Sequence, residues 1–330
     1  MKKRILVGGG GGFIGGELAR VLLERGHEVV VADIKPLDEW YQRHEDAENH
    51  SLNLEGRENC LEAMEGCEEV YNLACNMGGM GFIESNRALC MLSVLINTHM
   101  LMAAREHGVN KFFYSSSACV YPDYRQEETD VAALKESDAY PAVPENGYGW
   151  EKLFSERLCK HFEEDFGMNV RVYRLHNVYG PDGTWDGGRE KAPAALCRKV
   201  IEAQDTGNME IEIWGDGEQT RSFMYIDDCI TGIDKLMASD FTSPLNLGRS
   251  ELVSINGLLD IIEGIAGVQL KRRYNLSAPQ GVRGRNSDNT LIKEVLDWEP
   301  EVDLATGLEK TFYWIKEQYL RRKSGERVLQ

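Results

Sequence analysis

The glycine-rich N-terminal segment constrains the fold of this chain more than any other feature. A short apolar run at 4–7 predicts a strand, and an amphipathic helical pattern follows it. Between the two lies the spacing Gly9-x-x-Gly12-x-x-Gly15. Glycines at these positions allow a tight turn, bring the backbone close to a pyrophosphate and let the helix pack on the strand. The segment therefore predicts the opening strand, turn and helix of a dinucleotide-binding Rossmann fold.

The same region supplies further candidate contacts to a dinucleotide. Phe13 and Ile14 lie between the last two of these glycines, so we expect both beside the bound cofactor. A second apolar strand, at 29–33, ends in Asp33. A carboxylate there would bind the adenosine ribose hydroxyls and would repel a 2′-phosphate, which predicts NAD rather than NADP as the cofactor.

Strands and helices alternate along the chain to about residue 177. Three further apolar runs are typical of buried parallel strands, and two long helical patterns lie between them. The expected strands are 69–74, 111–115 and 170–174, and the expected helices are 86–107 and 149–166. This alternation predicts an α/β fold with a Rossmann-type doubly wound parallel sheet.

The pattern changes after Pro181. A polar, glycine-rich loop leads to a helix expected at 193–203 and to an alternating strand expected at 210–214. The residues from Lys316 onward are expected to form a frayed, solvated helix. The C-terminal part is therefore a smaller, mixed α/β unit.

The length of 330 residues leaves room for one Rossmann-type domain and a smaller one. We expect an NAD-binding domain over 1–177, with return segments near 222–248, and a substrate domain over 178–330. Ligands of such folds bind at the carboxyl ends of the strands.

Composition limits the partners. The chain has 37 Lys and Arg against 54 Asp and Glu, a net charge of −17, which argues against nucleic acid and against an anionic membrane surface. No segment approaches the ~20 apolar residues that a membrane span needs. The eight cysteines include no C-x-x-C pair, and the seven histidines show no paired metal spacing. We expect a cytoplasmic, reduced enzyme without a metal.

Candidate catalytic groups occur in three short segments. Tyr148 and Lys152 are four residues apart and share a helix face. A phenol has a pKa near ~10, and an adjacent ammonium would lower it, so the pair could deprotonate a hydroxyl while a nicotinamide accepts the hydride. Ser117 follows a predicted strand, at the end where ligands bind. Cys119 and Lys191 add two groups able to take and return protons on carbon.

These features together resemble the extended short-chain dehydrogenase/reductase superfamily over essentially the whole chain. Within it, five segments in the same order resemble the GDP-mannose 3,5-epimerase family: 77–82, 116–122, 187–194, 214–221 and 281–288. The 4,6-dehydratases carry an Asp-Glu pair where this chain has Ala118-Cys119, and the UDP-hexose 4-epimerases have no proton-carrying residue there. This chain departs from the family at Cys75, at Asn53, where an Asp often meets the adenine, and in having glycine throughout 8–12.

The resemblance implies a reaction through a transient 4-keto sugar. Tyr148 would be the base for the C4 hydroxyl, Ser117 would bond the same oxygen, and Lys152 would hold Tyr148 and the nicotinamide ribose. Cys119 would remove the proton alpha to the ketone, and Lys191 would return one from the opposite face. The products would be GDP-L-galactose and some GDP-L-gulose, and NAD would be regenerated.

The resemblance also implies substrate contacts and a homodimer. The expected contacts to the GDP-sugar fall into three sets: Gly78 and Gly79 against the sugar; Asn177, Glu190 and Gln219 to the sugar or ribose; and Lys199, Arg221 and Arg285 to the diphosphate, with Arg283 less certain. The dimer would pair two long helices from each subunit. The histidines, His176 included, are expected to be structural.

Two other functions remain open at this point. Another NAD-dependent nucleotide-sugar enzyme, a 4-epimerase or a 4,6-dehydratase, would not need Cys119 together with Lys191. A non-catalytic NAD-binding regulator would not need the Tyr148/Lys152 pair.

Overall fold

The computed structural model describes residues 2–329 and contains a seven-stranded parallel sheet in the order β11-β6-β5-β4-β1-β2-β3. Its strands are β1 (Arg4–Gly8), β2 (Glu28–Asp33), β3 (Glu48–Ser51), β4 (Glu69–Asn72), β5 (Lys111–Ser117), β6 (Val170–Leu175) and β11 (Leu245–Leu247). The order runs outward from β1 in both directions, so the crevice beyond the carboxyl ends of β1 and β4 is the place for a ligand. The predicted doubly wound sheet is confirmed.

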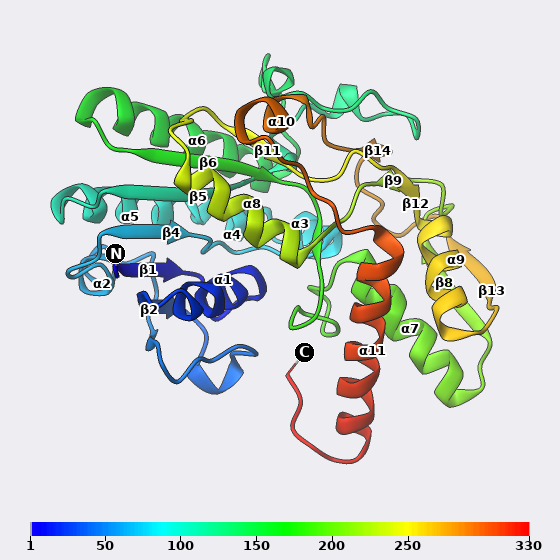
Figure 1. The fold of residues 1–330 in the computed structure, drawn as a ribbon. Helices are drawn as coiled ribbons and strands as arrows, with labels where there is room; N and C mark the ends of the chain where they lie inside the picture. Colours follow the sequence, from blue (N-terminus) through cyan, green and yellow to red (C-terminus); the bar gives the residue numbers. More distant parts are fainter. Residues whose placement is uncertain (1, 330) are drawn as a thin grey trace.

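Helices cover both faces of this sheet (Figure 1). One face carries α1 (Phe13–Glu24) and α8 (Ile226–Ala238), and the other carries α2 (Arg57–Ala63), α5 (Val94–Glu106) and α6 (Asn146–Phe166). Successive strand residues point to opposite faces, so Ile5 and Val7 of β1 pack in the first core and Leu6 packs in the second. This alternation explains why the strands are apolar throughout.

The single helix expected over 86–107 is wrong in detail. The structure has α4 (Arg87–Leu92) and α5, with a break at Ser93. The buried Ser93 hydroxyl accepts a hydrogen bond from the Asn76 backbone N–H at 2.9 Å. The break therefore ties the helix to the loop that follows β4.

This stretch also corrects the expectation about apolar segments. Residues Arg87–Glu106 are long and apolar enough to span a membrane by length and composition, with a mean hydropathy of 1.4. In the structure, 44% of the apolar window is buried, and Met100 and Leu101 pack in the core beside α2 and α6. Buried helices of globular folds meet the same criterion, so composition alone is weak evidence for a span.

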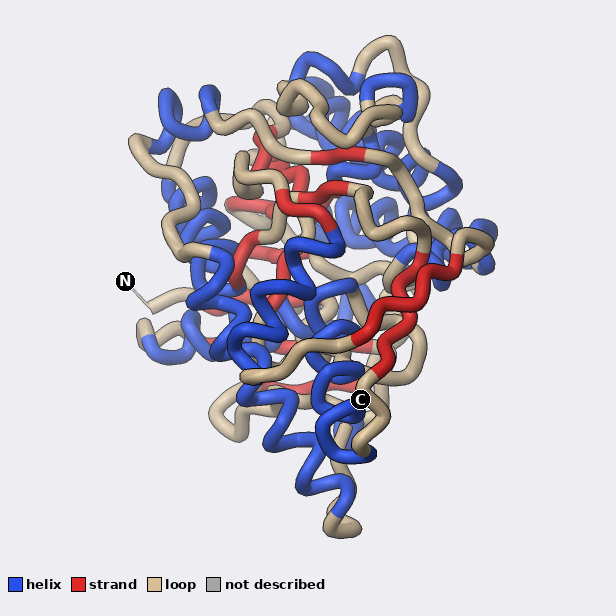
Figure 2. The backbone as a smooth tube through the Cα atoms, turned by 90° about the vertical axis from the view of Figure 1, so that its right-hand side faces the viewer, coloured by secondary structure: helices blue, strands red, loops and turns tan. Residues whose placement is uncertain are grey.

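The second unit lies beside the carboxyl ends of the sheet strands (Figure 1), and Figure 2 shows it facing the viewer. Its helices are α7 (Ala192–Thr206), α9 (Ile255–Ala266) and α11 (Leu304–Lys323). Its small sheets pair β8 (Glu210–Trp214) with β13 (Lys271–Asn275), β9 (Thr220–Arg221) with β12 (Val253–Ser254) and β14 (Gly284–Arg285), and β7 (Val178–Tyr179) with β10 (Met224–Tyr225). The remaining helices are α3 (Met80–Ser85), α10 (Thr290–Leu296) and the 3₁₀ turns Leu37–Glu39, Ala118–Val120, Asp123–Arg125 and Glu136–Ala139.

The chain crosses between the two units more than once. After β9 and β10 it returns as α8 and β11, and β11 pairs with the edge strand β6 through Leu245 and Tyr173. The two units therefore share a continuous core, which includes Leu18 of α1 and Leu308 of α11.

The helix expected from Lys316 onward is solvated along most of its side chains, as expected, but it is anchored rather than frayed. α11 continues to Lys323, and Ile315 and Gln318 are buried. The indole N–H of Trp185 donates to the Leu329 carbonyl oxygen at 3.0 Å. The polar residues of this helix pair with the body of the protein, which a charge-rich sequence does not reveal.

Candidate active site

The turn between β1 and α1 has the form of a phosphate cradle. Gly9 has φ of +82°, and a Cβ there would lie 2.7 Å from the Ala74 backbone nitrogen. A Cβ on Gly15 would lie 2.4 Å from the Gly9 carbonyl oxygen. Gly12 caps α1 without a side-chain hydrogen bond, so the N–H groups at Phe13 and Ile14 face outward from the helix end. The backbone and helix dipole here fit the pyrophosphate of NAD.

Asp33 lies at the carboxyl end of β2, as predicted. Its carboxylate accepts a hydrogen bond from the Lys35 backbone N–H at 3.0 Å and is otherwise available to ribose hydroxyls. The side chain of Asn53, on the loop after β3, accepts from the Glu55 backbone N–H at 2.9 Å. The donor set of the cradle thus fits a dinucleotide, with an acidic group where a 2′-phosphate would have to sit.

Tyr148 and Lys152 lie on one face at the start of α6. This helix begins at Asn146, three residues before the predicted start at Gly149, so Tyr148 lies in its first turn. Lys152 Nζ donates to the Ser115 carbonyl oxygen at 2.9 Å and lies 5.6 Å from the centroid of the Tyr148 ring. Both side chains are buried. The lysine is thus fixed to the end of β5, beside the tyrosine.

The pKa of Tyr148 is raised in this structure, whereas Lys152 was expected from the sequence to lower it. Burial raises the pKa of Tyr148 well above its usual value, and the charges of neighbouring groups, Glu151 among them, raise it further. Glu151 is buried, and its Oε2 lies 3.7 Å from Lys152 Nζ. Glu151 thus places a negative charge beside both the ammonium and the phenol.

Ser117 and Cys119 occupy the turn after β5. The Ser117 hydroxyl accepts a hydrogen bond from the Cys119 backbone N–H at 3.2 Å, and the nearby Ser117 side chain lowers the pKa of the Tyr148 phenol against the effect of burial. Cys119 and Tyr148 pack in one cluster with Ile83 and Cys90, and Cys75 lies against it. The structure therefore brings the predicted base, the serine and the cysteine together.

Arg285 lies against Cys119. Its Nη1 is 3.5 Å from the Cys119 Sγ, and its Nη2 donates to Glu145 at 2.6 Å. Its Nε donates to the buried side chain of Gln126. Burial raises the pKa of Cys119, the charge of Glu145 raises it further, and Arg285 opposes both. The predicted diphosphate ligand thus has a carboxylate and a thiol as its partners in this structure.

Lys191 occupies the N-cap position of α7 and is partly buried. Burial lowers the pKa of its ammonium, and the negative charge that Cys119 carries as a thiolate would raise it. Gly79 approaches the segment before Lys191: its N–H donates to the Arg189 carbonyl oxygen at 3.0 Å, and a Cβ on it would lie 2.6 Å from the Glu190 carbonyl oxygen. Predicted groups from distant parts of the sequence therefore come together near Cys119 and Tyr148.

Gly78 and Gly79 allow this close packing because they have no Cβ. A Cβ on Gly78 would lie 2.9 Å from Phe82, and Gly79 caps α3. The two glycines were expected against the sugar, whereas in the structure Gly79 lies against the backbone of Glu190.

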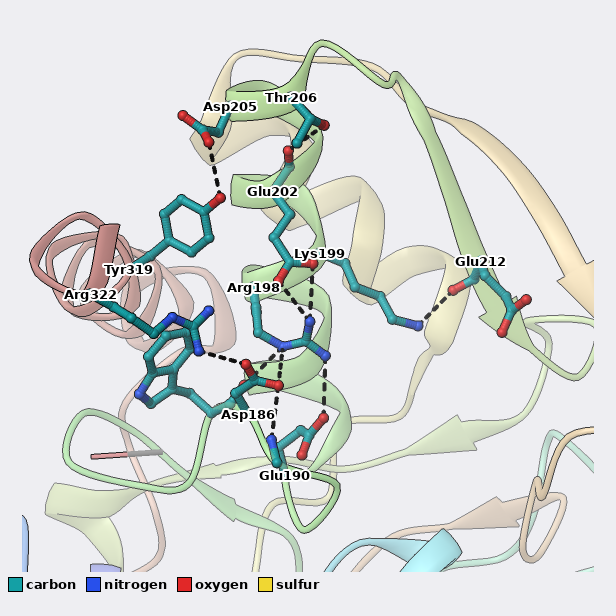
Figure 3. A network of polar contacts seen from close by, with 12 residues as sticks. Asp186, Glu190, Arg198, Lys199, Glu202, Asp205, Thr206, Glu212, Tyr319 and Arg322 are labelled. Atoms are coloured by element: carbon teal, nitrogen blue, oxygen red, sulfur yellow. Dashed lines mark hydrogen bonds and ion pairs between the residues drawn. The ribbon is translucent and has the colours of Figure 1, made fainter. Parts of the chain in front are cut away.

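A polar network anchors the loop that carries Lys191 (Figure 3). Arg198 of α7 pairs with Asp186 at 3.4 Å and with Glu190 at 3.3 Å. Arg322 of α11 donates to Asp186 at 2.7 Å. The carboxylate of Glu190 also accepts from the Gly188 N–H at 2.6 Å, so its partners lie in the loop and on α7. The C-terminal helix therefore helps to position Lys191.

The predicted diphosphate ligands divide into two groups. Arg283 and Arg285 pair with Asp216 and Glu145, at 2.8 and 2.6 Å. In contrast, Lys199 donates to the Glu212 carbonyl oxygen at 2.9 Å, and Arg221 donates to the Val282 carbonyl oxygen at 2.6 Å.

Three cations of the cleft lack a carboxylate partner. Within residues 2–329, no Asp or Glu oxygen lies within ion-pair distance of Lys191, Lys199 or Arg221. Burial lowers the pKa of Lys199, and burial together with the charge of Arg285 lowers the pKa of Arg221 to about 10. Buried positive charge without a counter-ion favours an anionic ligand.

Asn177, Gln219 and His176 are the remaining residues that were given a role from the sequence. Asn177 has φ of +30°, and its side-chain amide donates to the Ser222 carbonyl oxygen at 3.1 Å. Gln219 donates to the Trp214 carbonyl oxygen at 2.8 Å, and its buried Oε1 has no partner among the described residues. His176 is fully buried, and burial lowers its pKa to about 3, so it is neutral.

Sequence reasoning missed two buried carboxylates. Glu145 precedes Tyr148 by three residues, and Glu151 immediately precedes Lys152. The available signal was that both carboxylates lie in the segment of Tyr148 and Lys152, which was assigned to catalysis from the sequence. Their partners were not visible, because Arg285 lies 140 residues from Glu145 in the sequence.

Comparison with known proteins shows similarity over the whole chain. The sequence model of the NAD dependent epimerase/dehydratase family matches residues 5–248. The chain is 49% identical over 324 residues to GDP-mannose 3,5-epimerase 1 of Oryza sativa subsp. japonica, covering 98% of this chain and 84% of that protein. It is 48% identical over 322 residues to GDP-mannose 3,5-epimerase of Arabidopsis thaliana, covering 97% and 84%. The structure of UDP-glucose 4-epimerase from Thermotoga maritima with UDP-glucose matches with a TM-score of 0.87 at 26% identity, covering 96% and 99%.

Proposed function

This chain belongs to the NAD-dependent epimerase/dehydratase family, and we propose that it epimerises GDP-D-mannose at C3 and C5 to GDP-L-galactose, with some GDP-L-gulose. The observation that carries the proposal is the presence of Cys119 and Lys191 at the cleft that holds Tyr148. Two proton-carrying groups beyond the Tyr/Lys pair are what inversion at carbon requires.

The order of the reaction follows from the acidity of the sugar. Protons on C3 and C5 are not acidic enough for a side chain to remove while C4 carries a hydroxyl. A ketone at C4 makes both neighbours alpha to a carbonyl, so that an enediolate can hold the charge. The chemistry that bound NAD supplies is reversible hydride transfer at C4.

The side chains of the cleft have distinct roles in this scheme. Tyr148 exchanges the proton of the C4 hydroxyl, and Ser117 bonds the same oxygen. Lys152, fixed at 2.9 Å to the Ser115 carbonyl oxygen, orients Tyr148. Cys119 and Lys191 act on opposite faces of the ring, since inversion requires one group to remove a proton and another to return one.

The unpaired cations support an anionic nucleotide-sugar. Lys199 and Arg221 are held in place by backbone carbonyl oxygens and have no carboxylate partner within residues 2–329. Their charges suit the diphosphate of GDP-mannose, because charge-assisted hydrogen bonds to phosphate are strong ones. The local charge thus outweighs the net charge of −17.

The two alternatives account for fewer of these residues. A UDP-hexose 4-epimerase shares the fold, but it inverts only C4 and has no task for Cys119 and Lys191. A non-catalytic NAD-binding protein has no task for Tyr148 held beside Lys152.

Incubation with GDP-mannose in heavy water tests the proposal directly. We expect deuterium at C3 and C5 of the sugar, because the protons on both carbons pass through exchangeable side chains. Mass spectrometry and NMR would locate the label, and UDP-glucose would serve as the matched control substrate. Comparable conversion of UDP-glucose, without deuterium at C3 or C5, would favour the 4-epimerase instead.

We also propose that the protein is a homodimer built on α4, α5 and α6. Large apolar side chains are exposed on these neighbouring helices: Leu92 on α4, Leu95 and Met102 on α5, and Trp150 and Phe154 on α6, of which Phe154 is 54% exposed. Such a patch on a soluble protein marks an interface.

Sedimentation velocity should therefore give the mass of two chains. The substitution Phe154→Asp is expected to shift the protein toward a single chain, because it places a charge in the centre of the apolar patch. Tyr313→Asp, at an exposed aromatic residue of α11, is the control. A native protein that sediments as one chain would contradict the proposal.

A further inference from the structure

The reaction places a demand on the pair Cys119 and Lys191. Each inversion removes a proton from carbon on one face and returns a proton from the other face. One group of the pair therefore ends with one proton more and the other with one fewer. When the same group removes the proton at both carbons, the pair must be reset before the second carbon is inverted, and again before the next turnover.

Glu145 is the carboxylate that lies beside Cys119. Arg285 Nη1 lies 3.5 Å from the Cys119 Sγ, and Nη2 of the same planar guanidinium donates to Glu145 Oε2 at 2.6 Å. The sulfur and the carboxylate are therefore both held by the same guanidinium. The Glu145 backbone N–H also donates to the Cys119 carbonyl oxygen at 3.0 Å, which holds the two residues together.

Glu145 also reaches solvent. It lines a cavity of about 490 Å³ together with Gln126 and Arg283. The exposed side chains of Asp123 and Glu127 line the same cavity, so water has access to it. Among residues 2–329, Cys119 is not part of the cavity wall. Glu145, only 5% exposed, thus lies between the thiol and the cavity.

We infer that Glu145 relays protons between the Sγ of Cys119 and water in this cavity. In the release direction, the S–H bond of Cys119 breaks as an O–H bond forms on Glu145, and the carboxylic acid then passes the proton to water. Uptake follows the same steps in reverse, and no electron is transferred. The inference rests on the proposed function, because only inversion at carbon requires the reset.

The electrostatics of the site suit a relay rather than a store of protons. Burial raises the pKa of Cys119. Burial also raises the pKa of Glu145, but Arg285 outweighs it, so the pKa of this carboxyl lies below its usual value, and a hydrogen bond with Cys119 lowers it further. A proton on Glu145 is therefore short-lived, while Arg285 keeps its charge beside both groups.

The substitution Glu145→Gln tests the relay, because the amide can still bond Arg285 and cannot carry a proton. With enzyme in excess over GDP-mannose, we expect the first inversion to stay within about twofold of wild type. Steady-state turnover should fall about tenfold or more, as expected for loss of a proton-transfer group. The ratio of doubly inverted GDP-L-galactose to singly inverted GDP-L-gulose should also fall. Glu127→Gln, on the wall of the same cavity, is the matched control and should behave as wild type.

Two results would overturn the inference. One is a wild-type product ratio and turnover in Glu145→Gln. The other is an equal loss in single-turnover and steady-state rates, which would mean that Glu145 only positions Arg285. Glu145→Asp keeps a carboxylate and should recover part of the steady-state rate; no recovery would count against the relay. Failure of the proposed function is distinct, since wild-type enzyme would then introduce no deuterium into GDP-mannose.

Discussion

Replacing Tyr148 with phenylalanine is expected to lower turnover of GDP-mannose by roughly 10²–10⁴-fold, the usual contribution of a general acid–base group. The substitution removes one oxygen atom from a buried ring that packs against Cys119, so the cluster should keep its shape. Without the phenol, no positioned group takes the proton of the C4 hydroxyl, and no ketone forms. Deuterium should therefore be absent from both C3 and C5.

The measurement is the rate of product formation together with the deuterium content of recovered substrate in heavy water. Tyr313→Phe removes the same oxygen atom from an exposed tyrosine of α11 and is the control. If Tyr148→Phe kept more than about a tenth of wild-type turnover, the phenol would not be the base, because such a small loss lies below the range for this kind of catalysis.

Replacing Cys119 with serine is expected to separate oxidation of C4 from inversion. Serine keeps the size and the backbone contact to Ser117, but a hydroxyl is a far weaker acid than a thiol, even beside Arg285. We expect the C4 hydroxyl to be oxidised and restored as before, while conversion to GDP-L-galactose falls roughly 10²–10⁴-fold. Deuterium exchange at C3 and C5 should fall in parallel.

Lys191→Met removes the group proposed to act on the other face of the ring. We expect conversion and deuterium exchange to fall as in the Cys119→Ser enzyme. The substitution removes a partly buried cation that has no carboxylate partner within residues 2–329, so folding should not suffer. The matched control for Cys119→Ser is Cys67→Ser, which removes the thiol of a buried cysteine in the second core. Full deuterium exchange in the Cys119→Ser enzyme would remove this residue from the mechanism.

The position of Arg285 changes how the substrate site is understood. The sequence grouped it with Lys199 and Arg221 as three cations for a diphosphate. In the structure its guanidinium contacts Cys119, Gln126 and Glu145, whereas Lys199 and Arg221 remain without carboxylate partners among the described residues. The cation beside the thiol and the two cations proposed to bind the diphosphate are therefore different residues.

Features that depend on local geometry could be predicted from the sequence alone. The β1–α1 turn follows from glycine spacing, because the turn, the helix start and the strand are adjacent in the chain. Tyr148 and Lys152 share a face because they lie one turn apart on one helix. The buried parallel strands follow from apolar runs, and even their alternation with helices is a property of neighbouring segments.

The tertiary structure alone decided the partners of the buried charges. Cys119 and Arg285 are 166 residues apart, and Arg322 reaches Asp186 across 136 residues, so no local pattern announces either contact. Likewise, only burial shows that Glu151 places a negative charge beside Lys152 and that Glu145 lies between a thiol and water. The physical reason is that the pKa of an ionisable group and the energy of its ion pairs depend on desolvation and on nearby counter-ions. Both arise only when distant segments pack together.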